Sequence, residues 1–364
     1  MARRLVNDGV NAQNTLIINR ELSDFNFLSS HKDLDDLLRL YKSEVKPEGK
    51  VYLFIDEVQM IDGWEITVNS CSQNYAEEYE VFLSGSNSRL LSGELATLLS
   101  GRCICFEIFP FSFSEYAGIS GEEQNKACYM EYMTSGALPE LLALSQPEMK
   151  RNYVSAIKDT VLLRDIIQRH RIRDPKLLED IFVFLVNNAS NLISVGAVVN
   201  YFKGQGRKTS YDAVANYIGL EDTFLVHRCD RYDIRGKDII AGNAKYYVND
   251  LAYRNYLYPS YGYGFGYLLE NLVYLELRRE GYLVYTGVRK GKEVDFVARK
   301  ADRVIYLQCA YLLADETTVE REYSTLETIS DSFEKIVVSL DDLTMPLRNG
   351  IRHIQAWKLP ELLQ

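Results

Sequence analysis

Two adjacent carboxylates, Asp56 and Glu57, close the apolar run VYLFI at residues 51–55. A hard cation such as Mg²⁺ prefers oxygen ligands, and a second carboxylate beside a bound nucleotide can orient and deprotonate water. A buried strand lies centrally in a sheet, so its carboxyl end opens on the crevice where ligands bind. The stretch therefore predicts a magnesium ligand at Asp56 and a catalytic base at Glu57, with a plain solvated turn as the alternative.

Polar residues follow the next apolar run, in LSGSNSRLLSG. Ser84, Ser86 and Asn87 are expected at the carboxyl end of the neighbouring strand, where a polar side chain can sense a γ-phosphate. Arg102 lies just before the run after that, where a guanidinium can stabilise charge on a transferred phosphoryl group, in a neighbouring subunit. A surface or helix-capping arginine is the alternative for Arg102.

The phosphate-binding loop G-x-x-x-x-G-K-[ST] occurs nowhere in the 364 residues. The nearest match, GQGRKTS at 204–210, has the wrong spacing and comes after the carboxylate pair, so it is interpreted as a turn before a helix. We expect such a loop one or two strand-helix units before the Asp-Glu strand. Upstream of that strand there is room for only one strand, TLIINREL, at 15–22.

The elements that must position these residues alternate along the first third. Apolar runs predict strands at 15–22, 50–56, 80–86 and 103–109, and helical periodicity predicts helices at 31–45, around 62–74, and over SRLLSGELATLLSG. Continuous buried-type strands separated by helices indicate a mostly parallel sheet in an α/β fold. The middle third is helical and ends in strands near 225–232 and 245–249, the outline of a winged helix-turn-helix. The last third returns to an α/β pattern.

Composition limits the class of protein. Hydrophobic residues make up 47% and charged residues 25%, typical of a soluble globular chain of two or three domains. We see no membrane span or signal peptide and place the protein in the cytoplasm. Six cysteines without a C-x-x-C pair and four distant histidines argue against a zinc site or a disulfide framework. The net charge of −10 is concentrated before residue 150, so the middle third repels nucleic acid least.

Three stretches, VYLFIDEVQMIDGWE, VFLSGSNSRLLSGELATLLSGR and FEIFPFSFSEY, resemble AAA-type ATP-binding proteins of bacteria and archaea that carry a C-terminal domain of unknown function. The likeness continues through SGALPELLAL, TVLLRDIIQRHRIRD, LLENLVYLELRREGY and KEVDFVARK. It implies an AAA-type domain without its phosphate loop at 1–115, a helical and winged-helix region at 116–255, and a restriction-endonuclease-like domain at 256–364.

The resemblance also implies ATP and Mg²⁺ as cofactors and assigns residue roles. Asp56 corresponds to the magnesium ligand, Glu57 to the residue that activates water, Ser86 and Asn87 to the γ-phosphate sensor, and Arg102 to an arginine finger. Members of the family ordinarily begin with a strand, a glycine-rich loop and its helix, and this sequence begins after them. Without the loop's N–H groups and lysine the triphosphate loses most of its binding site, so we expect poor ATP hydrolysis or none.

The same resemblance places degenerate nuclease residues in the last third. A restriction-endonuclease-like core needs a helix acid, a hairpin Asp and Glu-x-Lys on the next strand. Glu270, Asp295 and Gln308 occupy these positions, and Ala310 stands where the lysine belongs. Gln308 is uncharged and Ala310 can do no acid-base chemistry, so we expect a fold retained for binding rather than a nuclease. An ordinary amphipathic edge strand is the alternative for KEVDFVARK.

DNA is the alternative partner, through Arg207 and Lys208 at the start of the second helix of the winged-helix pattern. Asp212 follows closely and the local charge is small, so a structural winged helix between domains competes with this hypothesis. A protein partner or self-association is the other expectation, and a non-catalytic scaffold is the other function. No membrane partner is expected.

Overall fold

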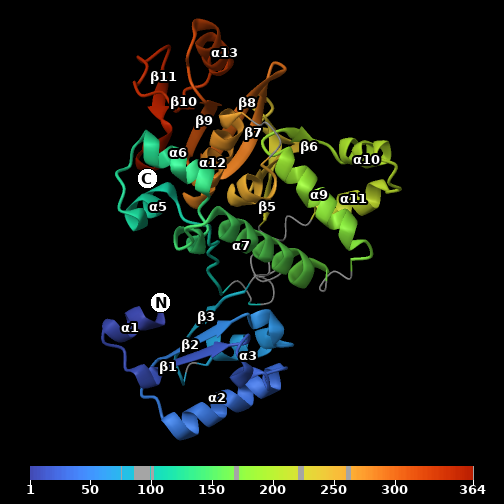
Figure 1. Cartoon of the computed structure of the whole chain (residues 1–364). Helices are drawn as coiled ribbons and strands as arrows, with labels where there is room; N and C mark the ends of the chain where they lie inside the picture. The colour runs from blue at the N-terminus through green and yellow to red at the C-terminus, as the bar shows by residue number, and fades with distance from the viewer. Residues whose placement is uncertain are drawn as a thin grey trace. The chain divides into compact units, whose positions relative to one another are not determined.

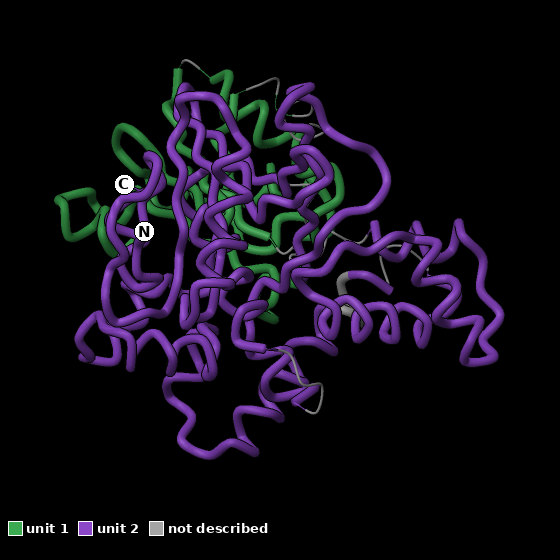
Figure 2. The backbone as a smooth tube through the Cα atoms, turned by 90° about the horizontal axis from the view of Figure 1, so that it is seen from above, with its two compact units in different colours: residues 1–107 green, residues 108–364 purple. Residues whose placement is uncertain are grey.

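The computed structural model describes residues 1–74, 76–85, 99, 102–167, 172–219, 225–259 and 264–363, without the side chains of 162–165. These residues form two compact units, 1–107 and 108–364, shown in different colours in Figure 2. The second unit includes both the predicted winged-helix region and the predicted C-terminal domain. No helix in the described ranges is long and apolar enough to cross a membrane.

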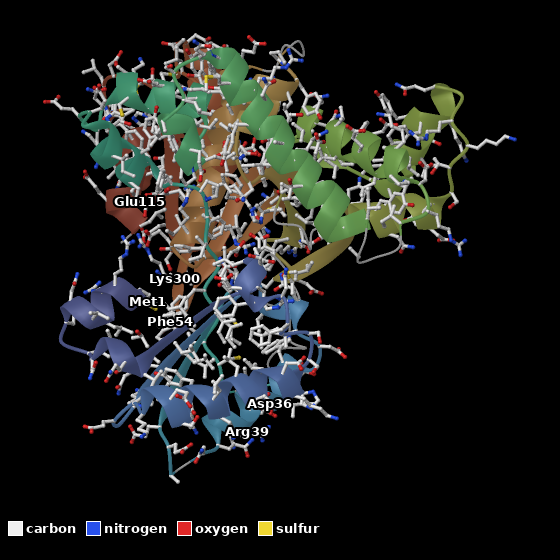
Figure 3. All side chains as sticks on the ribbon, turned by 60° about the horizontal axis from the view of Figure 1, so that its bottom comes forward. Met1, Asp36, Arg39, Phe54, Glu115 and Lys300 are labelled. Atoms are coloured by element: carbon white, nitrogen blue, oxygen red, sulfur yellow. The ribbon has the colours of Figure 1, made fainter. Side chains whose placement is uncertain are left out.

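The first unit is built on a three-stranded parallel sheet in the order β1-β2-β3. Leu53 and Ile55 of the central strand are buried with Leu34 and Leu38 of α2, because a strand places alternate residues on one face. On the other face Phe54, labelled in Figure 3, stacks on Phe82 with ring centroids 4.6 Å apart. The elements are α1 (Ala2–Asn7), β1 (Thr15–Asn19), α2 (His31–Val45), β2 (Val51–Asp56), α3 (Trp64–Ser72) and β3 (Tyr79–Leu83).

Local signals set most of these elements, and one prediction fails. The helix predicted at 31–45 is confirmed, and its start is fixed by a capping box between Ser30 and Asp33. The strand predicted at 103–109 is wrong, since these described residues join no sheet and Ile104 and Phe106 are 83% and 76% exposed. Among the described residues it has no neighbouring strand to pair with, and a strand without a partner leaves its backbone groups unbonded. The helix predicted over SRLLSGELATLLSG lies almost wholly outside the described residues.

The second unit is one mixed sheet of eight strands surrounded by helices, in the order β11-β10-β9-β8-β7-β5-β6-β4 (Figure 1). Its strands are β4 (Leu192–Ile193), β5 (Val226–Asp233), β6 (Asp238–Val248), β7 (Leu283–Arg289), β8 (Lys292–Lys300), β9 (Arg303–Ala310), β10 (Glu334–Ser339) and β11 (Ile351–Gln355). β5 runs parallel to β7. This pairing joins the predicted central and C-terminal regions in a single sheet.

The helices of this unit pack on both faces of the sheet. Every residue of α12 from Leu268 to Leu277 is buried, and the apolar ones among them form a cluster that includes Phe296. α13 packs in a separate cluster with Val297, on the opposite face. The helices are α5 (Phe113–Ser120), α6 (Lys126–Ser135), α7 (Pro147–Asp159), α9 (Pro175–Asn187), α10 (Val195–Gly204), α11 (Tyr211–Ile218), α12 (Phe265–Arg279), α13 (Glu316–Glu327) and α14 (Leu359–Leu363). A π-helical segment, Thr160–Ile167, continues α7.

Candidate functional site

The first candidate site is the carboxyl edge of the three-stranded sheet. The parallel register sets Asn19, the last residue of β1, opposite Asp56, the last residue of β2. Ser84 directly follows β3, and its N–H donates to the carbonyl oxygen of Ile55 at 3.0 Å, which extends the ladder by one residue. The three strand ends therefore present the amide of Asn19, the carboxylate of Asp56 and the hydroxyl of Ser84 side by side. The sequence predicted Asp56 and Ser84 at strand ends.

Asp56 and Ser84 contact each other directly. The Ser84 hydroxyl donates to Asp56 Oδ1 at 2.6 Å, a charge-assisted hydrogen bond of the short kind. The other carboxylate oxygen, Oδ2, accepts no hydrogen bond from any residue in the described ranges. Asp56 is thus oriented by its neighbour and keeps one oxygen available for a ligand.

Glu57 adopts a left-handed backbone conformation, with φ of 53°. This conformation costs a residue with a side chain about 1 kcal/mol or more, and such strain is concentrated at functional sites. It turns the chain off the line of β2 and into a short 3-10 helix, Val58–Met60. The Glu57 carboxylate accepts a hydrogen bond from the side-chain amide of Gln59, which holds it near the strand end.

The other predicted nucleotide residues are not gathered at this edge. Arg102 is exposed, and its backbone N–H donates to the carbonyl oxygen of Leu99 at 3.0 Å. No contact in the described ranges joins the Arg102 guanidinium to Asp56 or Ser84. Ser86 and Asn87 lie outside the described residues.

The chemistry of these groups fits a hard cation better than a triphosphate. A carboxylate oxygen beside a hydroxyl is the donor set that Mg²⁺ takes, and Mg²⁺ commonly uses only one or two carboxylates and keeps several waters. Among the described residues, no three His, Cys, Asp or Glu side chains come together as a metal site. A triphosphate needs the backbone N–H groups and lysine of a phosphate loop, and the sequence holds no such motif.

The second candidate site is a cluster of charged side chains inside the eight-stranded sheet. It contains Glu270 of α12, Asp295 of β8 and Gln308 of β9, the three residues that the sequence assigns to a degenerate nuclease site. The Asp295 N–H donates to Gln308 Oε1 at 3.4 Å, and the Cys309 N–H donates to Asp295 Oδ2 at 2.8 Å. Ala310, where a nuclease lysine is expected, is 4% exposed at the end of β9.

A lysine that sequence reasoning missed lies at the centre of this cluster. Lys245 of β6 is 3% exposed, and its Nζ is 2.8 Å from Glu270 Oε1, 2.7 Å from Glu293 Oε1 and 3.7 Å from Asp295 Oδ1. The Tyr247 hydroxyl also donates to Glu270 Oε1, at 2.6 Å. No spacing in the sequence connects β6 to α12 and β8, so only the fold brings Lys245 there.

Burial and mutual charge set the protonation of the cluster. Burial disfavours charge on Lys245, but Glu270, Asp295 and Glu293 together outweigh it and raise the pKa of its ammonium, which stays charged. Burial, with the Glu270 charge adding to it, raises the pKa of Asp295 to about 8. Near neutral pH the Asp295 carboxyl is therefore mostly protonated, and the ammonium is balanced by the other carboxylates.

Arg207 and Lys208, the basic residues predicted to contact DNA, differ in whether their charge is paired within the protein. Arg207 Nη2 is 3.0 Å from Asp174 Oδ1, and Nη1 of the same side chain pairs with Asp180, so its charge is satisfied within the protein. Lys208 is exposed and makes no ion pair with a described residue.

Two family models match parts of the chain. A family model described as an AAA domain matches residues 1–117. The three-stranded parallel sheet and its Asp56 edge therefore belong to an AAA-type, ATPase-like domain. A second family model, a domain of unknown function (DUF8612), matches residues 127–261.

Two curated relatives extend the likeness over most of the chain. An uncharacterized protein of Haemophilus influenzae is 32% identical over 340 residues, covering 92% of this chain and 83% of the relative. An uncharacterized protein of Methanocaldococcus jannaschii is 30% identical over 310 residues, covering 81% and 68%. The chain belongs to the family of these proteins. No solved structure matched the chain.

Proposed function

We propose that the protein binds a magnesium-nucleotide complex at the carboxyl edge of β1, β2 and β3 and couples nucleotide state to its C-terminal part. The observation that carries the proposal is the 2.6 Å hydrogen bond from Ser84 Oγ to Asp56 Oδ1, which orients a carboxylate at the end of a central parallel strand. Asp56 would ligate Mg²⁺, and Glu57, the next residue in the chain, would orient and deprotonate the water that attacks a γ-phosphate. ATP and Mg²⁺ are the cofactors that an AAA domain implies.

Residues 1–364 by themselves are proposed to hydrolyse ATP poorly or not at all. The sequence has no G-x-x-x-x-G-K-[ST] motif, so the β- and γ-phosphates lack the N–H groups and lysine that hold them in line for attack. Ser86 and Asn87 as γ-phosphate sensors, and Arg102 as a finger toward a neighbouring copy, remain parts of this proposal. The exposed guanidinium of Arg102 supports its reach toward another molecule.

The C-terminal part is proposed to hold a winged helix and a restriction-endonuclease-like core. The order α9, β4, α10, α11, β5, β6 with β6 between β4 and β5 supports the first. The order α12, β7, β8, β9, α13, β10 supports the second. Lys245 places its ammonium among the carboxylates and Ala310 supplies no acid-base group, so this core is proposed to bind rather than cut.

The test is calorimetric titration of the full chain with Mg·ATP and Mg·ADP, with an Asp56→Asn variant. Asp36 of α2, which pairs with Arg39 on the helix surface (Figure 3), offers a matched control, Asp36→Asn. Loss of one charged metal ligand costs about 1.5–3 kcal/mol, so Asp56→Asn is expected to weaken binding at least about tenfold. Asp36→Asn is expected to change nothing.

Two outcomes count against the proposal. Equal affinity of the Asp56→Asn variant and the unchanged chain places the nucleotide elsewhere. No heat of binding at millimolar nucleotide leaves the second candidate, a non-catalytic scaffold, which the internally satisfied cluster around Lys245 favours.

A further inference from the structure

Two hairpin turns lie together at one end of the eight-stranded sheet. One joins β5 to β6 at residues 234–237, and the other joins β7 to β8 at residues 290–291. β5 and β7 are parallel neighbours with Asp233 opposite Val288, so the turns that follow them project from the same end of the sheet. The Ile234 N–H donates to the carbonyl oxygen of Val288 at 3.2 Å, which fixes one turn against the other. We name residues 234–237 and 290–291 the paired turns.

The paired turns and the strand ends beside them carry six cations. None of the six makes an ion pair with a residue in the described part of the chain, and the Nε atoms of Arg231 and Arg289 are buried without a hydrogen-bond partner there. Lys292 makes one long contact, from Nζ to Ser324 Oγ at 3.4 Å. The six are Arg231, Arg235, Lys237, Arg289, Lys290 and Lys292, of which Arg231 and Arg289 are half-buried and the others exposed.

The carboxylates nearby are used inside the protein. Asp233 Oδ1 accepts the Arg235 N–H at 2.9 Å and so closes its own turn, and Asp238 Oδ1 accepts the Ile239 N–H at 2.8 Å. Glu293 pairs with Lys245 at 2.7 Å. Asp233 and Asp238 keep their charge, because a backbone N–H does not neutralise a carboxylate, but the six cations outnumber them. The surface at the paired turns is therefore net positive, although the chain as a whole carries a formal charge of −10.

We propose that the paired turns bind the phosphate backbone of duplex DNA. Lys and Arg side chains are common hydrogen-bond donors to DNA phosphates, and such contacts hold a protein on the duplex without reading its sequence. A helix or loop that inserts into a membrane surface carries several exposed apolar side chains, whereas among the described residues beside these turns the exposed large apolar side chain is Ile239, at 51%. Arg207, the arginine predicted from sequence to contact DNA, already pairs with Asp174 and Asp180.

The test is fluorescence anisotropy of the full chain with a labelled 24-base-pair DNA duplex over a range of salt concentrations. The test variant, Lys237→Gln with Lys290→Gln, removes two charges from the paired turns and keeps the side-chain length. The matched control, Lys203→Gln with Lys358→Gln, removes two exposed charges that lie outside the paired turns. Circular dichroism checks that both variants fold.

Removing two phosphate contacts lowers the slope of log affinity against log salt by about 1.8. The test variant is thus expected to bind about tenfold or more weakly at 0.1 M salt, and the control to stay within about twofold. Failure of the unchanged chain to bind the duplex at 50 mM salt overturns the proposal. So does a loss in the control with none in the test variant, or binding to phosphatidylserine vesicles without binding to DNA.

Discussion

Replacing Lys245 by Met probes the buried cluster of the second unit most sharply. Lys245 Nζ lies within 2.8 Å of Glu270 and Glu293 and at 3.7 Å from Asp295. Methionine keeps a similar length and removes the charge, so these carboxylates lose their common cation. Removing one partner of a buried ion pair costs about 3–5 kcal/mol, because the remaining charge is left buried and uncompensated. We expect that decrease in the free energy of unfolding at pH 8.5.

The cost is expected to depend on pH in a definite direction. Burial raises the pKa of Asp295 to about 8 in the folded state. The protonated carboxyl therefore stabilises the fold fully at a pH below the pKa of Asp295 in the unfolded chain. This stabilisation is lost as the pH rises through about 8. Lys245 offsets part of that loss by pairing with the carboxylates as they ionise. Without Lys245 the loss is larger, so the destabilisation by Lys245→Met is smaller at pH 5 than at pH 8.5.

Urea unfolding of the full chain measures this effect, with pulsed hydrogen exchange and mass spectrometry read on peptides from α12. That readout follows the second unit separately from the first. Lys358→Met, at an exposed lysine, is the matched control and is expected to change stability by about 0.5 kcal/mol or less. Adding Glu270→Gln to Lys245→Met is expected to restore part of the loss. A cost below about 1 kcal/mol at pH 8.5, or one independent of pH, refutes the reasoning.

Two further predictions concern single residues of the fold. Gly136→Ala is expected to destabilise the second unit by about 2 kcal/mol or more in the same unfolding assay, because Gly136 has φ of 78° and an added Cβ lies 2.4 Å from Asp250 Oδ1; a smaller change refutes this. Iodoacetamide at pH 8 is expected to label exposed Cys105 and spare Cys229, whose pKa burial raises to about 12; mass spectrometry showing equal labelling contradicts it.

Strands supported by local signals could be predicted from the sequence, whereas strands that depend on a distant partner could not. The run at residues 51–56 forms β2 because its alternate residues are buried against α2. The run at 103–109 has equally strong β-type residues, but its conformation depends on a neighbouring strand that the described residues do not supply. Hydrophobic pattern reports burial tendency and carries no information about that partner.

The candidate sites show the same division. Glu270 and Asp295 could be proposed from the sequence because each lies in a short stretch, LLENLVYLELRREGY or KEVDFVARK, that resembles the family. Lys245 could not be predicted as a member of this cluster. It lies on β6, and only the order of strands in the folded sheet brings β6 near Glu270 and Asp295. Arg207 looked like a DNA contact in the sequence, and only the packing of α9 shows that Asp174 and Asp180 neutralise it.

The proposed nucleotide site is tested most directly by electron paramagnetic resonance of Mn²⁺, a substitute for Mg²⁺, added with ADP to the full chain. The structure leaves Asp56 Oδ2 without a hydrogen bond from a described residue and orients it through Ser84. We predict a bound-Mn²⁺ signal that depends on ADP, persists in Asp36→Asn and is lost in Asp56→Asn. The same signal in Asp56→Asn as in the unchanged chain would contradict the assignment of Asp56 as the metal ligand.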